Sequence, residues 1–159
     1  MASNYELTHD ITGIDWWRLA DIMARAPLYD RKPFDLAMAF RNSYAVVFAH
    51  NDGKMVGAAR ATSDGVFYAS IFDAVVAPEH QGYGIGRLML EALIAKLPVE
   101  RIFLTSVFGK EGFYEKFGFL RQTNAMGLYD ELARGDAIAR GVLTTHHTAS
   151  SFGSENPPA

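Results

Sequence analysis

Apolar and polar positions change their spacing several times along the 159-residue chain, and each change predicts a new element. Where apolar residues recur every three to four positions, as Leu90, Leu93 and Leu97 do, a helix with one buried face is expected. Helices are predicted over residues 16–26, 33–42, 87–97 and 111–117, with a little more helix within 126–139. Asp15 is a candidate N-cap, and prolines mark several helix ends.

Runs that are rich in β-branched and aromatic residues predict strands elsewhere. They cover residues 5–8, 44–50, 54–62, 66–76 and 101–107, with a closing strand or hairpin over 119–121 and 125–129. Residues 51–53 (NDG) and 63–65 (SDG) are turn sequences. The three middle strands are therefore predicted to form an antiparallel meander.

The composition is that of a folded globular chain, with 49% hydrophobic and 13% aromatic residues. We expect one domain over residues 1–143 and a disordered polar tail over 144–159. The formal net charge of -3 and the lack of a basic stripe argue against a nucleic-acid partner. Cysteine is absent, which excludes disulfides, thiolate metal ligands and an acyl-cysteine intermediate.

Both ends of the chain are polar. The first ten residues do not resemble a signal peptide, and no apolar run is long enough to span a bilayer. We therefore expect a cytoplasmic protein without a membrane partner. His146 and His147 have no neighbouring candidate ligands in the tail and are expected to be solvated, so no metal site is expected.

Residues 81–86, QGYGIG, place three glycines between a predicted strand and a predicted helix. The spacing G-x-G-x-G after antiparallel strands disfavours a dinucleotide fingerprint, and Arg87 at the next position excludes the G-K-[ST] end of a P-loop. Two interpretations stay open from spacing alone. The glycines form a plain turn, or they let the backbone approach a pyrophosphate at the first turn of the helix.

Together with a second motif, this segment resembles the GNAT superfamily of N-acetyltransferases. Residues 81–86 match that family's Q/R-x-x-G-x-G/A signature, and residues 112–119, GFYEKFGF, resemble its G/A-x-F-Y-x-x-x-G-F segment. One predicted helix and one strand separate the two motifs, and the resemblance spans roughly residues 45–119. Residues 57–81 with the second motif are most similar to plant and cyanobacterial arylalkylamine (serotonin-type) acetyltransferases and bacterial relatives.

The resemblance implies an α/β (α+β) GNAT fold. Its central mixed, mostly antiparallel sheet would have six to seven strands flanked by about four helices, with a V-shaped split after the long fourth strand. Acetyl-CoA would bind as the cosubstrate, with its pantetheine arm on the backbone of that strand and its pyrophosphate at the glycines. The implied cofactor-binding residues are Ala74, Val75, Val76, Gln81, Gly82, Tyr83, Gly84, Ile85, Gly86, Arg87 and Lys116.

Several side chains in this set carry a second interpretation. The apolar side chains of Val75 and Val76 are also candidates for the core. The two roles are compatible, because only the backbone of these residues would bind the cofactor. Gln81 would orient the loop, and Tyr83 is expected to be exposed. Arg87 would add charge or be merely solvated. The cofactor's 3′-phosphate would meet Lys116 or else Lys110.

The resemblance implies an acid for the departing thiolate, because attack of an amine on a thioester expels a group that benefits from gaining a proton. Tyr114 matches the family's general acid, and a phenol is protonated at neutral pH. The other interpretation is a core aromatic, since Phe113 and Phe117 flank it at helical spacing.

A base for the incoming ammonium group is less clearly marked. Many relatives carry a Glu in the long strand, where this chain has Ser70 or Phe72. Asp73 is the nearest acid, and it is either the base or a structural acid that bonds a neighbouring loop. The backbone N–H of Val76 is a candidate donor to the oxyanion of the tetrahedral intermediate.

The acceptor is expected to be a primary amine. A small molecule such as an arylalkylamine, amino acid or amino sugar leads, and a protein lysine or N-terminal amine is second. The alternative class is a non-catalytic acyl-CoA-binding module. A homodimer through the last strands is common in the family. Aromatic candidates for the amine pocket are Trp16, Trp17, Tyr29, Phe34 and Tyr68.

Overall fold

The computed structural model describes residues 4–26, 28 and 30–145. Its contacts divide the chain into two compact units, Met1–Phe113 and a second unit that begins at Tyr114. Each unit is described by itself below. Tyr29, His146 and His147 lie outside the described residues.

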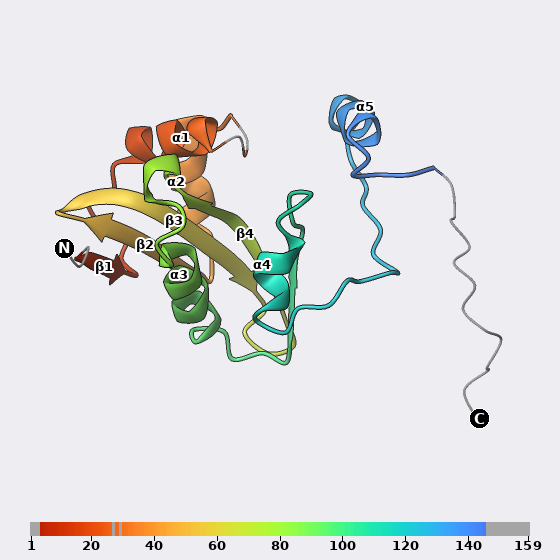
Figure 1. Cartoon of the computed structure of the whole chain (residues 1–159). Coiled ribbons are helices and arrows are strands. Elements are labelled where there is room, and N and C mark those ends of the chain that lie inside the picture. Colours follow the sequence, from red (N-terminus) through yellow and green to blue (C-terminus); the bar gives the residue numbers. More distant parts are fainter. Residues whose placement is uncertain (1–3, 27, 29, 146–159) are drawn as a thin grey trace. The chain divides into compact units, whose positions relative to one another are not determined.

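The first unit is built on a five-stranded sheet whose strands follow one another in chain order. The strands are β1 (Tyr5–Thr8), β2 (Ala45–Asn51), β3 (Lys54–Ser63), β4 (Tyr68–Val76) and β5 (Arg101–Leu104). The first four pair antiparallel, and β4 pairs with β5 in parallel. The predicted meander is confirmed, and the 24 residues of helix and loop between Val76 and Arg101 supply the crossover that a parallel pair requires (Figure 1).

Helices cover both faces of this sheet (Figure 1). The helices α1 (Trp16–Arg25) and α2 (Pro33–Arg41) lie on one face, where their apolar side chains pack with Phe48 and Val75 in one core cluster. Helix α3 (Ile85–Ile94) lies on the other face, and its buried residues are Ile85, Met89, Leu90 and Leu93. The strands that carry the predicted site are thus fixed from both sides.

Helix ends follow their local sequence. The Asp15 side chain accepts from the N–H of Arg18 at 3.0 Å and caps α1, as its position predicts. Proline begins α2, where a missing N–H costs no helical bond. Helix α3 has Gly84 at its N-cap in the left-handed conformation, with no side-chain cap, and begins two residues earlier than its apolar stripe predicts.

The second unit contains the end of α4 (Glu111–Glu115) and all of α5 (Glu131–Ala139). Asp130 caps α5 by accepting from the N–H of Ala133 at 2.9 Å. The strand or hairpin predicted over 119–121 and 125–129 does not form, so the prediction of six to seven strands is wrong for the described residues, which hold five. These segments contain no β-branched residue, and no described strand pairs with them.

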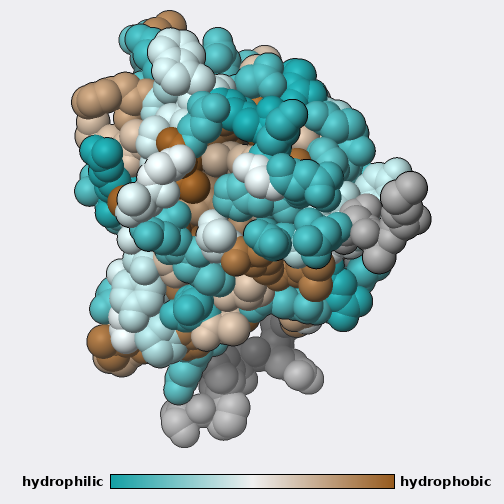
Figure 2. All heavy atoms as spheres, turned by 90° about the vertical axis from the view of Figure 1, so that its left-hand side faces the viewer, coloured by the Kyte–Doolittle hydropathy of each residue, from teal (hydrophilic) through white to brown (hydrophobic). Residues whose placement is uncertain are grey.

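Figure 2 shows a face on which hydrophilic side chains predominate and apolar ones appear as separate patches. Within residues 4–26, 28 and 30–145, no helix combines the length and the apolar character needed to cross a bilayer.

Candidate active site

The outer edge of β4 is open over its second half. Pairing with β5 runs from Tyr68 to Ile71 and stops there, opposite Leu104. Strand β4 continues to Val76 on its other edge, where β3 remains paired with it. Among the described strands none pairs with residues 72–76 on the β5 side, so this backbone is available to a ligand that lies along it.

A β-bulge lies where the two strands separate. Arg60 of β3 is opposite Phe72, and Ala58 is opposite Val75, so one residue of β3 faces both Asp73 and Ala74. Asp73 has a φ of 53°, in the left-handed region that few residues other than glycine adopt. A bulge of this kind bends its strand and increases its twist. The open half of β4 therefore takes a new direction directly after Asp73.

Val76 presents its backbone to the open edge. The N–H of Ala77 donates to the carbonyl of Val56 at 2.7 Å, which makes Gly57 and Val76 a pair without mutual hydrogen bonds. The N–H and C=O of Val76 consequently point away from β3. Its carbonyl accepts from the side-chain amide of Gln81 at 3.0 Å. This bond ties the glycine-rich loop to the end of β4 and leaves the Val76 N–H facing the open edge.

The glycine-rich loop ends in an uncapped helix start. Gly82 and Gly84 have φ angles of 84° and 82°, so the backbone conformation itself favours glycine at both positions. A Cβ at either position would meet no atom within 4 Å, which leaves room for a ligand. The first bond of α3 in the i to i−4 pattern runs from the N–H of Leu88 to Gly84 O at 3.1 Å. Three helical N–H groups before it therefore have no acceptor four residues back and favour an anion.

The positions of the side chains around this loop are compatible with an anion bound to its backbone. Tyr83 is exposed, as predicted. The Ile85 side chain is buried, so only its backbone is available. Gly86 packs closely, because a Cβ there would lie 3.5 Å from Phe113 and 3.7 Å from Val76. Arg87 is largely exposed and bonds Glu91 at 2.8 Å on its own helix.

The 3-10 helix η1 (Pro78–His80) precedes the loop and is anchored from two elements. Arg25 of α1 bonds Glu79 at 2.8 Å, and this bond is the main reason that the pKa of Glu79 is lowered to about 2. The Tyr5 hydroxyl of β1 lies 3.1 Å from Nδ1 of His80. The loop therefore starts from a fixed position.

Asp73 is engaged with arginine. Its side chain is 7% exposed and accepts from Nε of Arg60 at 2.6 Å, and Nη2 of Arg31 lies 4.0 Å from its other oxygen. Both carboxylate oxygens of Asp73 thus face arginine side chains, and this arrangement favours the structural interpretation. Sequence reasoning missed Arg60, although it is the one charged residue within the apolar run 55–61 of β3.

Tyr114 and Lys116 belong to the second unit. Burial raises the pKa of Tyr114 above its usual value, so its phenol stays protonated at neutral pH. The Tyr114 ring meets Phe119 edge-on, with their centroids 6.1 Å apart. Lys116 is exposed. The roles of both residues stay predictions that rest on the second motif.

The aromatic candidates for an amine pocket divide into two groups. Trp16 packs against Phe40 and Phe48 in the core, which leaves it little part in a pocket. Trp17, Phe34 and Tyr68 are exposed and remain candidates.

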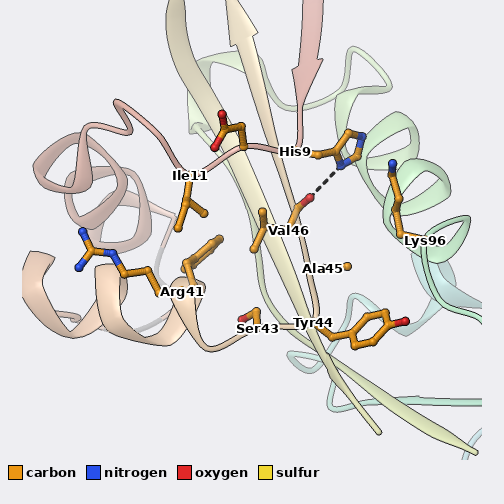
Figure 3. Close-up of a pocket in the computed structure, with 10 residues that line it drawn as sticks. His9, Ile11, Arg41, Ser43, Tyr44, Ala45, Val46 and Lys96 are labelled. Carbon is orange, nitrogen blue, oxygen red and sulfur yellow. Dashed lines mark hydrogen bonds between the residues drawn. The ribbon is translucent and has the colours of Figure 1, made fainter. Parts of the chain in front are cut away.

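A separate open pocket lies at the edge of β2 (Figure 3). Its lining includes His9, Arg41, Tyr44 and Lys96, and the His9 ring lies 2.8 Å from the carbonyl of Val46. It contains none of the predicted cofactor residues. No group of three potential metal ligands occurs in the part of the chain that the structure describes.

An open strand edge that leads to an uncapped, glycine-rich helix start offers backbone groups to an extended ligand that carries a phosphate. The model of the Acetyltransferase (GNAT) family matches residues 13–119, more than half of the chain, and its match ends on the last residue of the second motif. The chain belongs to this family of acetyltransferases, whose cosubstrate is acetyl-CoA.

Individual relatives agree with this assignment. Serotonin N-acetyltransferase 2, a chloroplastic protein of Oryza sativa subsp. japonica, is 30% identical over 94% of this chain and 74% of its own length. The chloroplastic GCN5-related N-acetyltransferase 2 of Arabidopsis thaliana is 36% identical over 57% of this chain and 45% of its own. The ribosomal-protein-S18-alanine N-acetyltransferase of Escherichia coli superposes with a TM-score of 0.65 and 25% identity, covering 75% of this chain and 79% of that chain.

Proposed function

We propose that the chain transfers the acetyl group of acetyl-CoA directly to the primary amine of a small molecule. The observation that carries the proposal is the continuous backbone site formed by the open half of β4 and the uncapped start of α3. An extended arm would lie along the strand edge, and a pyrophosphate would take the free N–H groups at the helix start. These two parts match the two halves of coenzyme A.

Different residues would assist different steps of the reaction. The free amine nitrogen attacks the thioester carbonyl carbon, a C–N bond forms, the C–S bond breaks and the thiolate leaves, while the nitrogen loses its proton to water. The Val76 N–H is the donor proposed for the carbonyl oxygen as its charge develops. Tyr114 is the acid proposed for the thiolate, and its raised pKa keeps the required proton in place. Because Asp73 is bonded to Arg60, we assign no carboxylate base.

A small amine is favoured by the rice relative, whose name states serotonin and whose match spans 94% of this chain. A protein amine is the alternative, because the Escherichia coli neighbour is named for a ribosomal protein. A non-catalytic acyl-CoA-binding module is the alternative of another class, and a phenol that serves as an acid would have no use in it. A homodimer and a cytoplasmic location stay predictions.

Paired glycine variants test the cofactor site. Gly84 and Gly13 both have positive φ angles, 82° and 71°, and both face open space. Valine at either position strains the backbone by about 1–2 kcal/mol. Only Gly84→Val is expected to weaken CoA binding, by at least about tenfold in isothermal titration, which corresponds to about 1.4 kcal/mol. Equal CoA affinity in both variants and the wild type would remove the proposed site.

Release of free thiol from acetyl-CoA across a panel of amines tests the reaction. The panel contains serotonin, tryptamine, amino acids, glucosamine and a lysine peptide. The chain has no cysteine, so a thiol reagent detects only the CoA product. Turnover with a small amine supports the proposal, and turnover with the peptide alone supports the protein alternative. CoA binding without turnover on any amine supports the non-catalytic class.

A further inference from the structure

The side chains around the bulge of β4 form an arrangement that the proposed reaction does not by itself require. Asp73 holds the left-handed bulge position at the start of the open half of the strand, which begins at Phe72. We propose that the ion pair between Arg60 and Asp73 is a positioning device that sets the direction of the open strand and thereby aims the Val76 N–H at the thioester. This inference rests on the proposed function.

Arg60 holds two consecutive residues of β4. Its guanidinium lies 5.1 Å from the ring centroid of Phe72, and its Nε donates to Asp73 at 2.6 Å. These residues are the last one before the bulge and the first one within it. A single side chain on the neighbouring strand therefore fixes both the ring that precedes the change of direction and the carboxylate at the change itself.

Two further contacts restrict Arg60 and Asp73. Nη1 of Arg60 lies 3.4 Å from the hydroxyl of Ser43, which follows α2. Arg31, between α1 and α2, reaches the other carboxylate oxygen of Asp73 at 4.0 Å. The side chains of Arg60 and Asp73 are only 16% and 7% exposed, so solvent screens this pair weakly.

The distance along the strand is short enough for the pair to affect catalysis. Three residues separate Asp73 from the Ala77 N–H that bonds β3, and Val76 lies between them with its N–H directed at the open edge. Val75 pairs with Ala58 of β3 directly before Val76, so a change in the bulge turns the Val76 N–H by shifting this pairing. The loop that would hold the pyrophosphate is anchored separately, by Arg25 and Tyr5. Loss of the pair should thus impair acetyl transfer more than CoA binding.

Three variants separate positioning from simple stability. Asp73→Asn removes the charge but keeps a residue that tolerates positive φ. Arg60→Met removes the guanidinium and leaves a buried carboxylate, so it is expected to be unstable. The double variant Arg60→Met/Asp73→Asn contains neither charge, and its thermal stability is expected to lie closer to that of the wild type.

The measurements are kcat and KM for acetyl-CoA, by thiol release with the fastest amine of the panel, together with thermal unfolding and CoA titration. We expect kcat to fall about 100-fold in Asp73→Asn and in the double variant, because a displacement of about 1 Å can cost that much. KM for acetyl-CoA and the affinity for CoA should change less than about threefold, since the pyrophosphate contacts remain. The low kcat should persist in the double variant after its stability recovers.

Two results would overturn the inference while leaving the proposed function intact. One is wild-type kcat in a folded Asp73→Asn variant. The other is a kcat in the double variant that recovers together with its stability, which would make the pair a structural contact only. A wild-type chain that neither binds CoA nor releases thiol would overturn the inference and the proposed function together.

Discussion

Replacement of Gly57 by alanine tests how closely β3, β4 and α3 approach one another at the candidate site. Gly57 is opposite Val76, and a Cβ there would lie 2.8 Å from the backbone oxygen of Val75 and 2.9 Å from Sδ of Met89. The Met89 side chain is flexible, but the oxygen moves only if β4 moves. Overpacking of this kind costs about 1–3 kcal/mol, whereas Gly→Ala gains at most about 1 kcal/mol through the unfolded chain. The clash should outweigh the gain, so the free energy of unfolding should fall by up to about 2 kcal/mol.

Thermal unfolding and acetyl-CoA titration measure the two consequences. A loss of about 2 kcal/mol corresponds to a fall in Tm of roughly 4–8 °C for a chain of this size. Alanine at position 57 would displace the whole strand edge along which the pantetheine arm would lie, rather than turn one N–H. Acetyl-CoA binding should therefore also weaken about tenfold, the value of one hydrogen bond of about 1.4 kcal/mol. Gly135→Ala in α5 is the matched control, because its Cβ meets no atom within 4 Å, and its stability should stay equal or rise. A Gly57→Ala protein with unchanged Tm and unchanged affinity would refute the packing argument.

Two further substitutions probe titrating groups. Tyr114→Phe should lower kcat while leaving acetyl-CoA affinity nearly unchanged, and an equal kcat in the variant would exclude the acid role. Because burial raises the pKa of Tyr114, the kcat of the wild type should stay constant through neutral pH and fall only above about pH 10. Glu79→Gln should lower Tm at pH 7, because the pKa of Glu79 is depressed from 4.5 to about 2 in the folded protein. The difference in Tm between wild type and variant should be full above pH 4.5 and disappear as the pH falls through about 2. A difference in Tm that does not vary with pH would contradict this assignment.

Elements that depend on local sequence were predictable. The turn sequences and the runs rich in β-branched and aromatic residues correctly predicted the meander, because adjacent strands joined by short turns pair without further information. The glycines at 82 and 84 lie before α3, where the sequence predicted a turn or a close backbone approach, and both have positive φ angles, which glycine adopts at little cost. The match of the GNAT family over residues 13–119 agrees with the resemblance that the two motifs carry.

Features that depend on contacts between distant residues were not predictable. The partner of Asp73 is Arg60 on another strand, and only the register of β3 against β4 brings them together. The bulge has no sequence signal, because its left-handed residue is an aspartate rather than a glycine. The strand or hairpin predicted over 119–121 and 125–129 would also need a hydrogen-bonded neighbour, and no described strand provides one.

The central claim is that the open half of β4 and the start of α3 together hold coenzyme A. Titration of 15N-labelled protein with acetyl-CoA, followed by amide chemical shifts, tests this claim directly. The account predicts the largest shifts at the N–H groups of residues 82–87 and of Val76, with small shifts at His9 and Lys96 in the pocket beside β2. Large shifts confined to that pocket, or no shifts at saturating acetyl-CoA, would contradict it.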